Sequence, residues 1–402
     1  MPNETTQPAN SKITRMTELR HRRKIRHVRN IILAVLAVVL LVVYASGIYG
    51  RGLAMLSDLA DSALIGLRPG QGYPIKTGIA EPLQVESLGG GFVELGSKEL
   101  VAFSARGSQL RNIAHNYARP AISSGNNRFV LYNRSGNELR VESRSRTLYT
   151  RTYQQPLITA EMASNGTFAV VTGSSRYMAE VTVYDSTFET LYEWYPTERE
   201  GMPGCVSFAP DNRRFAVACL KAENGILVSN IYLLNTQKDE IVSSIHVSGG
   251  HVLQMHWIGK DNLLVLFNNH AAVYNAQTGE EKVTYSYGGK NLQSASVSGQ
   301  NTALLFQAEL ADAPATLVIL DPEMQILGTG SVPAPASGVV CTRTNAYVLR
   351  ESAVAAYDLT GAFQWEMRVD SAPQAIVNAK KLLVFEGGNV REVKQPAESS
   401  AK

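Results

Sequence analysis

A phrase of about a dozen residues recurs along the chain. It reads "VTVYDSTFETLY", "IYLLNTQKDEIV", "AVYNAQTGEEKVTY", "LVILDPEMQIL" and "VAAYDLTGAFQW". In each copy an apolar run ends at Asp or Asn, a short polar turn follows, and a second run begins. Two such runs joined by turn residues are typical of a β-hairpin. A chain that repeats one hairpin at intervals is restricted to a repeat architecture.

The interval between copies indicates which architecture this is. The residues that end the third apolar run of successive units are separated by 39, 42, 50, 40, 46 and 37 residues. They are Ser104, Ser143, Asp185, Asn235, Asn275, Asp321 and Asp358. Four-stranded propeller blades repeat at about this spacing. Shorter hairpins turn between them at phrases such as "SSGNN", "APDN" and "GKDN", and no long helical periodicity follows Gly72. We therefore predict an all-β chain with a single β-propeller over residues 72–394.

The ends of the repeat predict how the ring closes. We count eight first strands, and the last unit supplies only three strands before the polar C-terminal tail at 395–402, which we predict to be disordered. The segment "GYPIKTG" at 72–78 would supply the missing outer strand, joining the two ends and leaving no long exposed edge. Eight blades are favoured, with seven as the alternative because the first unit is weak. An open solenoid or several β-sandwiches are further alternatives.

The N-terminal region predicts a membrane anchor. Residues 1–30 carry eight Lys or Arg against two Glu, and the 19 residues from Ile31 to Tyr49 carry no charge. A helix of that length spans about 28 Å, enough to cross a bilayer. We predict a basic cytoplasmic tail at 1–30, a transmembrane helix at 31–50, a stem helix or linker at 51–71, and a C-terminal domain outside the cell membrane. A cleaved signal peptide, with processing near Ala45 to Gly47, is the alternative.

This organisation resembles a known family. One spanning helix, a stem and degenerate blades with third strands of the "VYD" and "AYD" type are similar to a domain-of-unknown-function family of membrane-anchored propellers from Gram-positive bacteria. The resemblance implies export and a propeller, and it transfers no catalytic residue. The blades also look like distant relatives of WD40 and quinoprotein propellers. The Gly-His and Trp-Asp pairs that recur from blade to blade in the former, and the tryptophan-docking repeats of the latter, do not recur in this sequence.

Several kinds of chemistry lack support in the sequence. The formal net charge is +3 and residues 1–30 account for +6, so the remainder is −3, which argues against nucleic-acid binding. His246, His251 and His256 are five residues apart, an odd spacing that puts neighbours on opposite faces of a strand. The chain has no G-x-S-x-G elbow and no complete phosphate loop. We therefore assign no catalytic residue, no metal ligand and no cofactor.

The three cysteines leave one question open. Cys205 and Cys219 flank the "APDN" hairpin in adjacent predicted strands, where the geometry allows a disulfide. Both also lie in strongly apolar strands, where small buried thiols fit well. Free buried thiols are favoured over the disulfide, with Cys341 buried alone.

Loop length predicts which face of the propeller binds a partner. The second-to-third-strand connections and the inter-blade links open on one face, and the chain is longest there at 173–180, 195–204, 220–230 and 308–316. The candidate binding residues are Arg176, Tyr177, Tyr195, Arg199, Lys221, Glu223, Asn224, Glu309 and Asp312. The leading hypothesis is a tethered, non-enzymatic scaffold that binds a protein or glycan of the cell envelope. The alternative is an envelope enzyme, a glycan hydrolase or lyase, with its site at the channel of the propeller.

Overall fold

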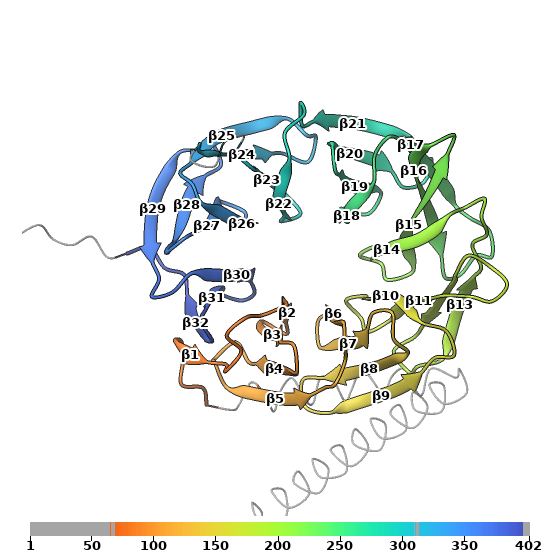
Figure 1. Cartoon of the computed structure of the whole chain (residues 1–402), viewed down its shortest axis with the longest axis horizontal. Coiled ribbons are helices and arrows are strands. Elements are labelled where there is room, and N and C mark those ends of the chain that lie inside the picture. The colour runs from red at the N-terminus through yellow and green to blue at the C-terminus, as the bar shows by residue number, and fades with distance from the viewer. Residues whose placement is uncertain (1–64, 66–68, 309, 311–312, 397–402) are drawn as a thin grey trace, which may run out of the picture. The chain divides into compact units, whose positions relative to one another are not determined.

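The described chain is a ring of eight four-stranded antiparallel sheets (Figure 1). This computed structural model describes residues 65, 69–308, 310 and 313–396. No helix in that part has the length and apolar character needed to cross a membrane. The predicted tail at 1–30, the predicted spanning helix at 31–50, the stem at 51–71 except residues 65 and 69–71, and all but residues 395 and 396 of the tail at 395–402 lie outside the described residues.

The first four blades follow one another along the chain, and each runs from an inner to an outer strand. Blade 1 is β2 (Gln84–Leu88), β3 (Gly91–Leu95), β4 (Glu99–Phe103) and β5 (Gln109–Ala114). Blade 2 is β6 (Pro120–Ser124), β7 (Arg128–Asn133), β8 (Glu138–Ser143) and β9 (Thr147–Thr152). Blade 3 is β10 (Leu157–Met162), β11 (Phe168–Thr172), β12 (Glu180–Tyr184) and β13 (Thr190–Trp194). Blade 4 is β14 (Met202–Phe208), β15 (Arg214–Glu223), β16 (Ile226–Asn235) and β17 (Ser243–Ser248).

The second half repeats this pattern until the last blade. Blade 5 is β18 (Val252–Ile258), β19 (Asn262–Phe267), β20 (His270–Asn275) and β21 (Glu281–Ser286). Blade 6 is β22 (Leu292–Val297), β23 (Thr302–Phe306), β24 (Ala315–Leu320) and β25 (Ile326–Val332). Blade 7 is β26 (Ala336–Cys341), β27 (Asn345–Arg350), β28 (Ala353–Asp358) and β29 (Phe363–Arg368). Blade 8 is β30 (Pro373–Asn378), β31 (Leu382–Glu386) and β32 (Asn389–Glu392), with β1 (Ile75–Lys76) as its outer strand.

The closure therefore occurs as the sequence predicted, and eight blades are confirmed. Ile75 pairs with Val390 and Lys76 with Asn389, so the start of the ring completes its last sheet. Ile75 is buried in a cluster with Phe92, Phe103 and Phe385, which joins blade 8 to blade 1. A closed ring leaves no sheet edge available at the junction.

The core lies between the blades rather than in the centre of the ring. Each of the eight apolar clusters combines residues from two neighbouring blades, as in the cluster that joins Ile231 and Leu233 of blade 4 to Leu263 and Val265 of blade 5. Second strands such as β11 and β23 are buried at every position. This burial explains their continuous apolar runs, because a strand covered on both faces has no solvent side for polar residues.

The recurring Asp, Asn or Ser has a structural role. Oδ1 of Asp185 accepts hydrogen bonds from the backbone N–H groups of Thr187 (2.8 Å) and Glu189 (3.0 Å), closing the turn between the third and fourth strands. Asn, Asp and Ser side chains are favoured in turns because they pair with backbone groups two to four residues ahead. The same turn is made at Ser104, Ser143, Asn235, Asn275, Asp321 and Asp358.

Candidate functional site

Connections from blades 3 and 4 form one continuous surface on the face predicted to bind. The β11–β12 connection meets the β13–β14 link, where Met178 N donates to Pro196 O at 2.9 Å. The rings of Tyr177 and Tyr195 lie 5.1 Å apart between the same two segments. The link in turn contacts the β15–β16 hairpin, because Lys221 Nζ donates to Arg199 O at 2.8 Å. We call residues 173–179, 195–203 and 220–230 the blade 3–4 surface.

One predicted loop in this surface is a hairpin instead. The segment 220–230 was expected to be an extended loop, but β15 and β16 each run for ten residues and pair as far as Glu223 and Ile226. The turn consists of Asn224 and Gly225, with φ of 51° and 81°. Two consecutive positive φ values define the tight hairpin turn that Asn-Gly favours. Blade 4 therefore projects a strand-paired hairpin where a long connecting loop was predicted.

The structure gathers seven of the nine candidate residues. Arg176 and Tyr177 lie on the β11–β12 connection, and Tyr195 and Arg199 lie on the β13–β14 link. Lys221, Glu223 and Asn224 lie at the tip of the hairpin. Glu309 and Asp312 belong to the β23–β24 connection of blade 6 and lie outside the described residues.

Exposed apolar groups distinguish the blade 3–4 surface more than its charges do. Ile226 is 53% exposed and Leu227 50% exposed, at the hairpin tip. Neither residue is among the predicted binding residues, which are all charged, polar or aromatic. The other large exposed hydrophobic residues of this surface are Tyr177, Tyr195, Met202 and Leu220. Large apolar side chains clustered on a rigid projection are typical of a protein-binding surface.

Two charged groups of this surface, Lys221 and Glu223, form an ion pair. Lys221 Nζ contacts Glu223 Oε1, and this hydrogen bond holds the pKa of the Glu223 carboxyl below its usual value. Tyr195 Oη donates to Glu193 Oε2 at 2.8 Å, which raises the pKa of Tyr195 to about 12. Exposed pairs of this kind contribute little to stability. They orient the side chains around the apolar groups.

The two cysteines of blade 4 are free thiols in the structure, so the disulfide alternative is not supported. Cys205 pairs with Ala218 and Pro203 with Cys219, and a bulge at Gly204 separates the two pairs. Cys205 packs in the cluster between blades 4 and 5, whereas Cys219 packs in the cluster between blades 3 and 4. The two thiols therefore point to opposite faces of one sheet. Burial raises the pKa of Cys205 to about 12, which makes the thiol unreactive.

A second candidate site lies in the middle of the ring, where the enzyme alternative placed a site at the channel but named none of its residues. A cavity of about 460 Å³ is lined by residues of blades 1 to 5, among them Glu86 of β2 and Glu161 of β10. Burial raises the pKa of Glu161 to about 8, and repulsion from Glu86 adds to the shift. Burial also raises the pKa of Glu86. The sequence segments "LQVESL" and "LITAEM" each place one carboxylate inside an inner strand, and this unusual position could have pointed to Glu86 and Glu161.

Polar side chains of these inner strands also bridge neighbouring blades. The Gln84 amide accepts from Ile122 N (3.1 Å) and donates to Ile122 O (2.8 Å). Ser124 N donates to Glu86 Oε2 at 2.6 Å. Ser123 Oγ accepts from Met162 N (2.9 Å) and donates to Glu161 Oε2 (3.0 Å). Free backbone groups along the inner strands are thereby satisfied, as buried polar groups require.

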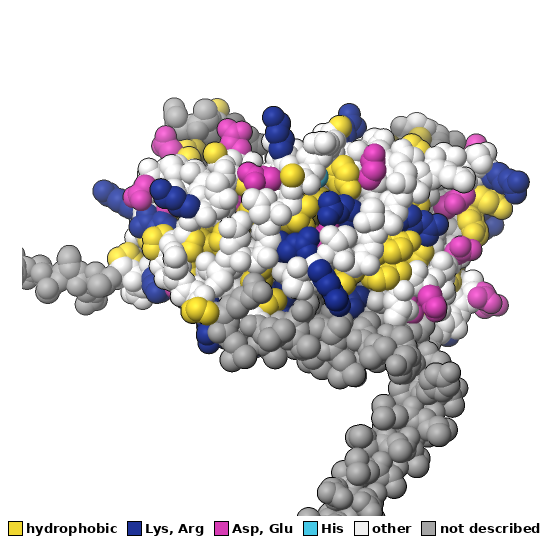
Figure 2. Space-filling view, turned by 90° about the horizontal axis from the view of Figure 1, so that it is seen from below, with side chains coloured by type: hydrophobic (Ala, Val, Ile, Leu, Met, Phe, Trp, Pro, Cys, Tyr) yellow, Lys and Arg dark blue, Asp and Glu magenta, His cyan; other side chains and the backbone are white. Residues whose placement is uncertain are grey.

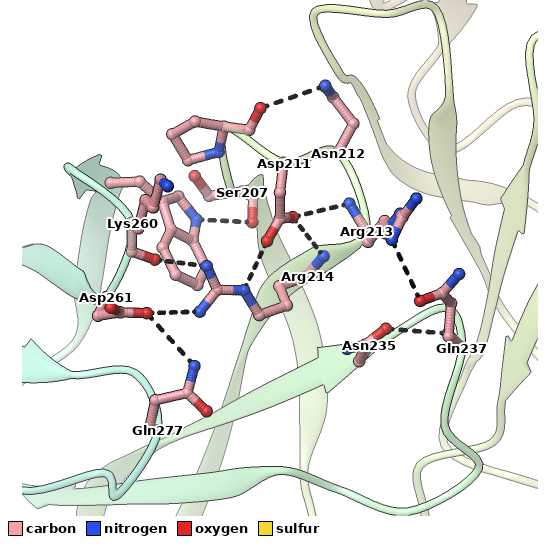
Figure 3. A network of polar contacts seen from close by, with 12 residues as sticks. Ser207, Asp211, Asn212, Arg213, Arg214, Asn235, Gln237, Lys260, Asp261 and Gln277 are labelled. Carbon is pink, nitrogen blue, oxygen red and sulfur yellow. Dashed lines mark hydrogen bonds and ion pairs between the residues drawn. The ribbon is translucent and has the colours of Figure 1, made fainter.

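On the face of the ring opposite the blade 3–4 surface, a polar network joins blades 4 and 5 (Figure 3). The Arg214 guanidinium donates to Asp211 (2.7 Å), Asp261 (2.9 Å) and the Lys260 carbonyl (2.7 Å). It also lies over the Trp257 ring, 5.7 Å from the centroid. Because its partners are turn residues of the two blades, we assign this network a structural role.

Positive charge is concentrated in residues 105–153, which include the outer strand of blade 1 and all of blade 2. Residues 105–153 contain nine Arg and no Lys, against two Glu. Figure 2 views the molecule from the side on which β5 and β9 lie in Figure 1, and Lys and Arg side chains are grouped near its centre. Arg111 and Arg140 both contact the buried carboxyl of Glu142, at 2.9 and 2.7 Å. The net charge of the whole chain does not reveal this cluster of arginines, because acidic residues elsewhere in the chain offset their charge.

Comparison with known proteins places the chain in a family. Residues 72–394 match DUF5711, a family of unknown function. The chain belongs to this family. The matched range coincides with the predicted propeller, and no curated protein matches. The predicted resemblance to a domain of unknown function is thus confirmed, whereas its membrane anchoring and Gram-positive origin stay predictions.

Solved propellers share the fold with this DUF5711 protein. Sqt1 of Saccharomyces cerevisiae has a TM-score of 0.58 at 10% identity, covering 81% of this chain and 100% of that one. BamB from Moraxella catarrhalis has a TM-score of 0.55 at 12% identity, covering 80% and 98%. The C-terminal WD40 domain of Sif2 has a TM-score of 0.56 at 11% identity, covering 81% and 99%. At these identities the likeness concerns the fold alone.

Proposed function

We propose that this protein is a membrane-tethered, extracytoplasmic scaffold whose blade 3–4 surface binds a protein or glycan of the cell envelope without catalysis. The uncharged segment at 31–50 and the basic residues before it support the tether and its orientation. The observation that carries the binding role is the projecting β15–β16 hairpin, which exposes Ile226 and Leu227 at its tip.

The geometry favours a preformed binding surface. The hairpin is an extension of two blade strands, and Asn230 Nδ2 donates to Glu200 O at 3.1 Å, so the adjacent link is held against it. A partner would meet groups that are already ordered, which reduces the conformational entropy lost on binding. A few large apolar anchors on such a surface supply most of the affinity in typical interfaces.

Site-specific cross-linking in the native cells tests this proposal. A photoreactive amino acid at position 224, on the hairpin, is compared with one at position 326, an equally exposed site on β25 of blade 6. We expect a reproducible adduct from position 224 only, and mass spectrometry of the adduct distinguishes protein from glycan. Equal labelling from both positions, or none from position 224, would contradict the proposal.

A matched pair of variants adds a second readout. Ile226→Asp with Leu227→Asp should abolish the adduct formed from position 224, because charges replace the apolar tip. Ile326→Asp with Leu327→Asp alters two exposed residues of β25 and should leave the adduct unchanged. Protease treatment of intact cells tests the location separately: degradation of the propeller domain is expected outside the membrane, and protection would refute the extracytoplasmic assignment.

The runner-up is an envelope glycan hydrolase or lyase, and the central cavity is the observation that favours it. Two carboxyl groups facing one cavity are the groups that glycan hydrolysis commonly requires. Turnover of purified envelope glycan, lost in both Glu86→Gln and Glu161→Gln, would support an enzyme. Absence of turnover in the wild-type protein would leave the scaffold as the only function proposed here.

A further inference from the structure

The central cavity combines acidic and apolar groups from neighbouring blades. Glu86 comes from β2 and Glu161 from β10, and both line the same space of about 460 Å³. Glu161 Oε2 accepts from Ser123, while Glu86 is held by Ser124 N and by the Gln84 amide at 2.6 Å. These bonds hold both carboxyl groups, from the inner strands of blades 1 and 3, against consecutive residues of β6, the inner strand that lies between them. Ile122, Val252 and Leu253 provide apolar lining.

We propose that this cavity binds an organic ammonium group, which sits between the carboxyl groups of Glu86 and Glu161. A cation placed there lets both carboxyl groups ionise despite their mutual repulsion, and it gains charge-assisted hydrogen bonds from them. The ligand is a primary amine carried by a basic side chain or by an amino sugar. The cavity adjoins the blade 3–4 surface, because Leu220 and Ser229 line it, but its carboxyl groups come from β2 and β10 and the proposal does not depend on the scaffold function.

The composition of the cavity favours an organic cation over a metal ion. No set of three or more His, Cys, Asp or Glu residues within the described parts of the chain is arranged to hold a metal. A hard divalent cation takes six or more oxygen ligands, well beyond the two carboxyl groups here. Apolar walls beside a pair of carboxyls instead match an amine attached to a carbon skeleton.

Binding should be linked to proton release. Glu161, with a pKa of about 8, carries a proton at pH 7 in the empty cavity. An ammonium ion favours the carboxylate, so the proton leaves as the ligand enters. The other titratable or charged groups that line the cavity are Tyr132, Arg134, Cys205, Cys219 and His251. Arg134 is held at the wall, since its Nε donates to the Tyr132 hydroxyl at 3.4 Å.

Calorimetry with charged and neutral probes tests the site. Glucosamine and lysine amide supply the amine from the two sources, and N-acetylglucosamine and Nε-acetyl-lysine amide are their neutral counterparts. At pH 7 we expect saturable binding of at least one amine, none of either acetylated form, and release of about one proton measured in buffers of different ionisation enthalpy. The amine that binds more tightly identifies the source.

Variants of the intact chain complete the test. Glu161→Gln keeps the oxygen that accepts from Ser123 but removes the negative charge, so affinity should fall about 10- to 100-fold and proton release should disappear. Glu323→Gln changes an exposed turn residue outside the cavity and should bind as the wild type does. Equal affinity in Glu161→Gln and the wild type, or no saturable binding of either amine, would overturn the proposal. Loss of partner adducts at position 224 would leave this result unaffected.

Discussion

At the scale of single residues, the repeated phrase is explained by one hydrogen-bonding atom. Oδ1 of Asp185 accepts three bonds: from Thr187 N, from Thr187 Oγ1 and from Glu189 N. The backbone groups ahead of it lose their partners if that oxygen is removed. A hydrogen-bond acceptor therefore recurs at the end of the third strands for a local reason, while the neighbouring residues vary with the packing between blades.

Asp185→Ala should lower the free energy of unfolding by about 1–3 kcal/mol, because a buried side chain that closes the turn is lost. Asp185→Asn retains an oxygen in the same place and should cost less than half as much. Urea denaturation of both variants measures the difference. If the two variants were equally destabilised, the acceptor oxygen would not explain the recurrence of Asp and Asn.

A second residue makes stability depend on pH. Glu94 of β3 is 1% exposed, its Oε2 has no hydrogen-bond partner within the described structure, and burial raises the pKa of its carboxyl from 4.5 to about 7. Between these two values the folded state keeps a proton that the unfolded chain loses. The contribution of Glu94 is therefore fully present below pH 4.5 and is lost as the pH rises through 7.

Glu94→Gln should remove this loss. Its free energy of unfolding should match that of the wild type near pH 4 and exceed it by about 3 kcal/mol at pH 8, because the neutral amide has no charge to bury. Denaturation curves across this range measure the difference between the two proteins. Glu351→Gln, at an exposed position, is the control and should show no such divergence. A constant offset at every pH would show that packing, rather than ionisation, distinguishes Glu94.

At the scale of elements, neighbouring blades are joined by polar side chains as well as by apolar clusters. Arg214 shows this most clearly, because its guanidinium contacts its own turn at Asp211 and the next blade at Asp261 and Lys260 (Figure 3). Arg213, next to it, makes one side-chain contact, at 3.5 Å to Gln237 of its own blade. The two arginines form a matched pair, alike in charge and sequence position but different in contacts.

Arg214→Lys should lower the free energy of unfolding by about 1–3 kcal/mol, since an ammonium group cannot reproduce the planar set of bonds. Arg213→Lys should change it by less than about 0.5 kcal/mol, as expected for an exposed group. Thermal denaturation of both variants measures the change in the free energy of unfolding that each substitution causes. Equal effects would mean that the network contributes nothing beyond net charge.

The elements also show where sequence reasoning succeeds and where it fails. Turn residues and apolar runs placed the strands of all eight blades, because both signals are local. The segment 220–230 was predicted to be a loop because its polar residues Lys221, Glu223 and Asn224 are typical of turns. In the structure, β15 and β16 continue through this segment as paired strands as far as Glu223 and Ile226. From Leu220 to Glu223 the extension of β15 alternates apolar and charged residues instead of continuing the apolar run that marks a blade strand.

At the scale of the whole molecule, the candidate sites depend on contacts between distant segments. Glu86 and Glu161 are 75 residues apart in the sequence and meet only because the ring brings β2 and β10 around one cavity. Loop length selected the segments that make up the blade 3–4 surface, since connections on one face of a propeller follow from strand order; its role in binding stays a prediction. No local pattern could show which inner-strand carboxylates converge, because this depends on the number of blades and on their register.

Ring closure is the property of the whole molecule that is most directly testable. Blade 8 depends on β1, which pairs with β32 from the other end of the propeller. Just after β1, Thr77 Oγ1 donates to Gly388 O, a residue 311 positions away in the sequence. Deleting residues 72–78 removes that strand and exposes β32 as an edge, so we expect a lower unfolding temperature and concentration-dependent association through the open edge. Deleting residues 397–402 at the other end is the control and should change neither property. Light scattering and calorimetry report both quantities. A monomeric deletion variant with an unchanged unfolding temperature would show that blade 8 closes the ring without β1, and that the apolar contacts of Phe385 with Phe92 suffice.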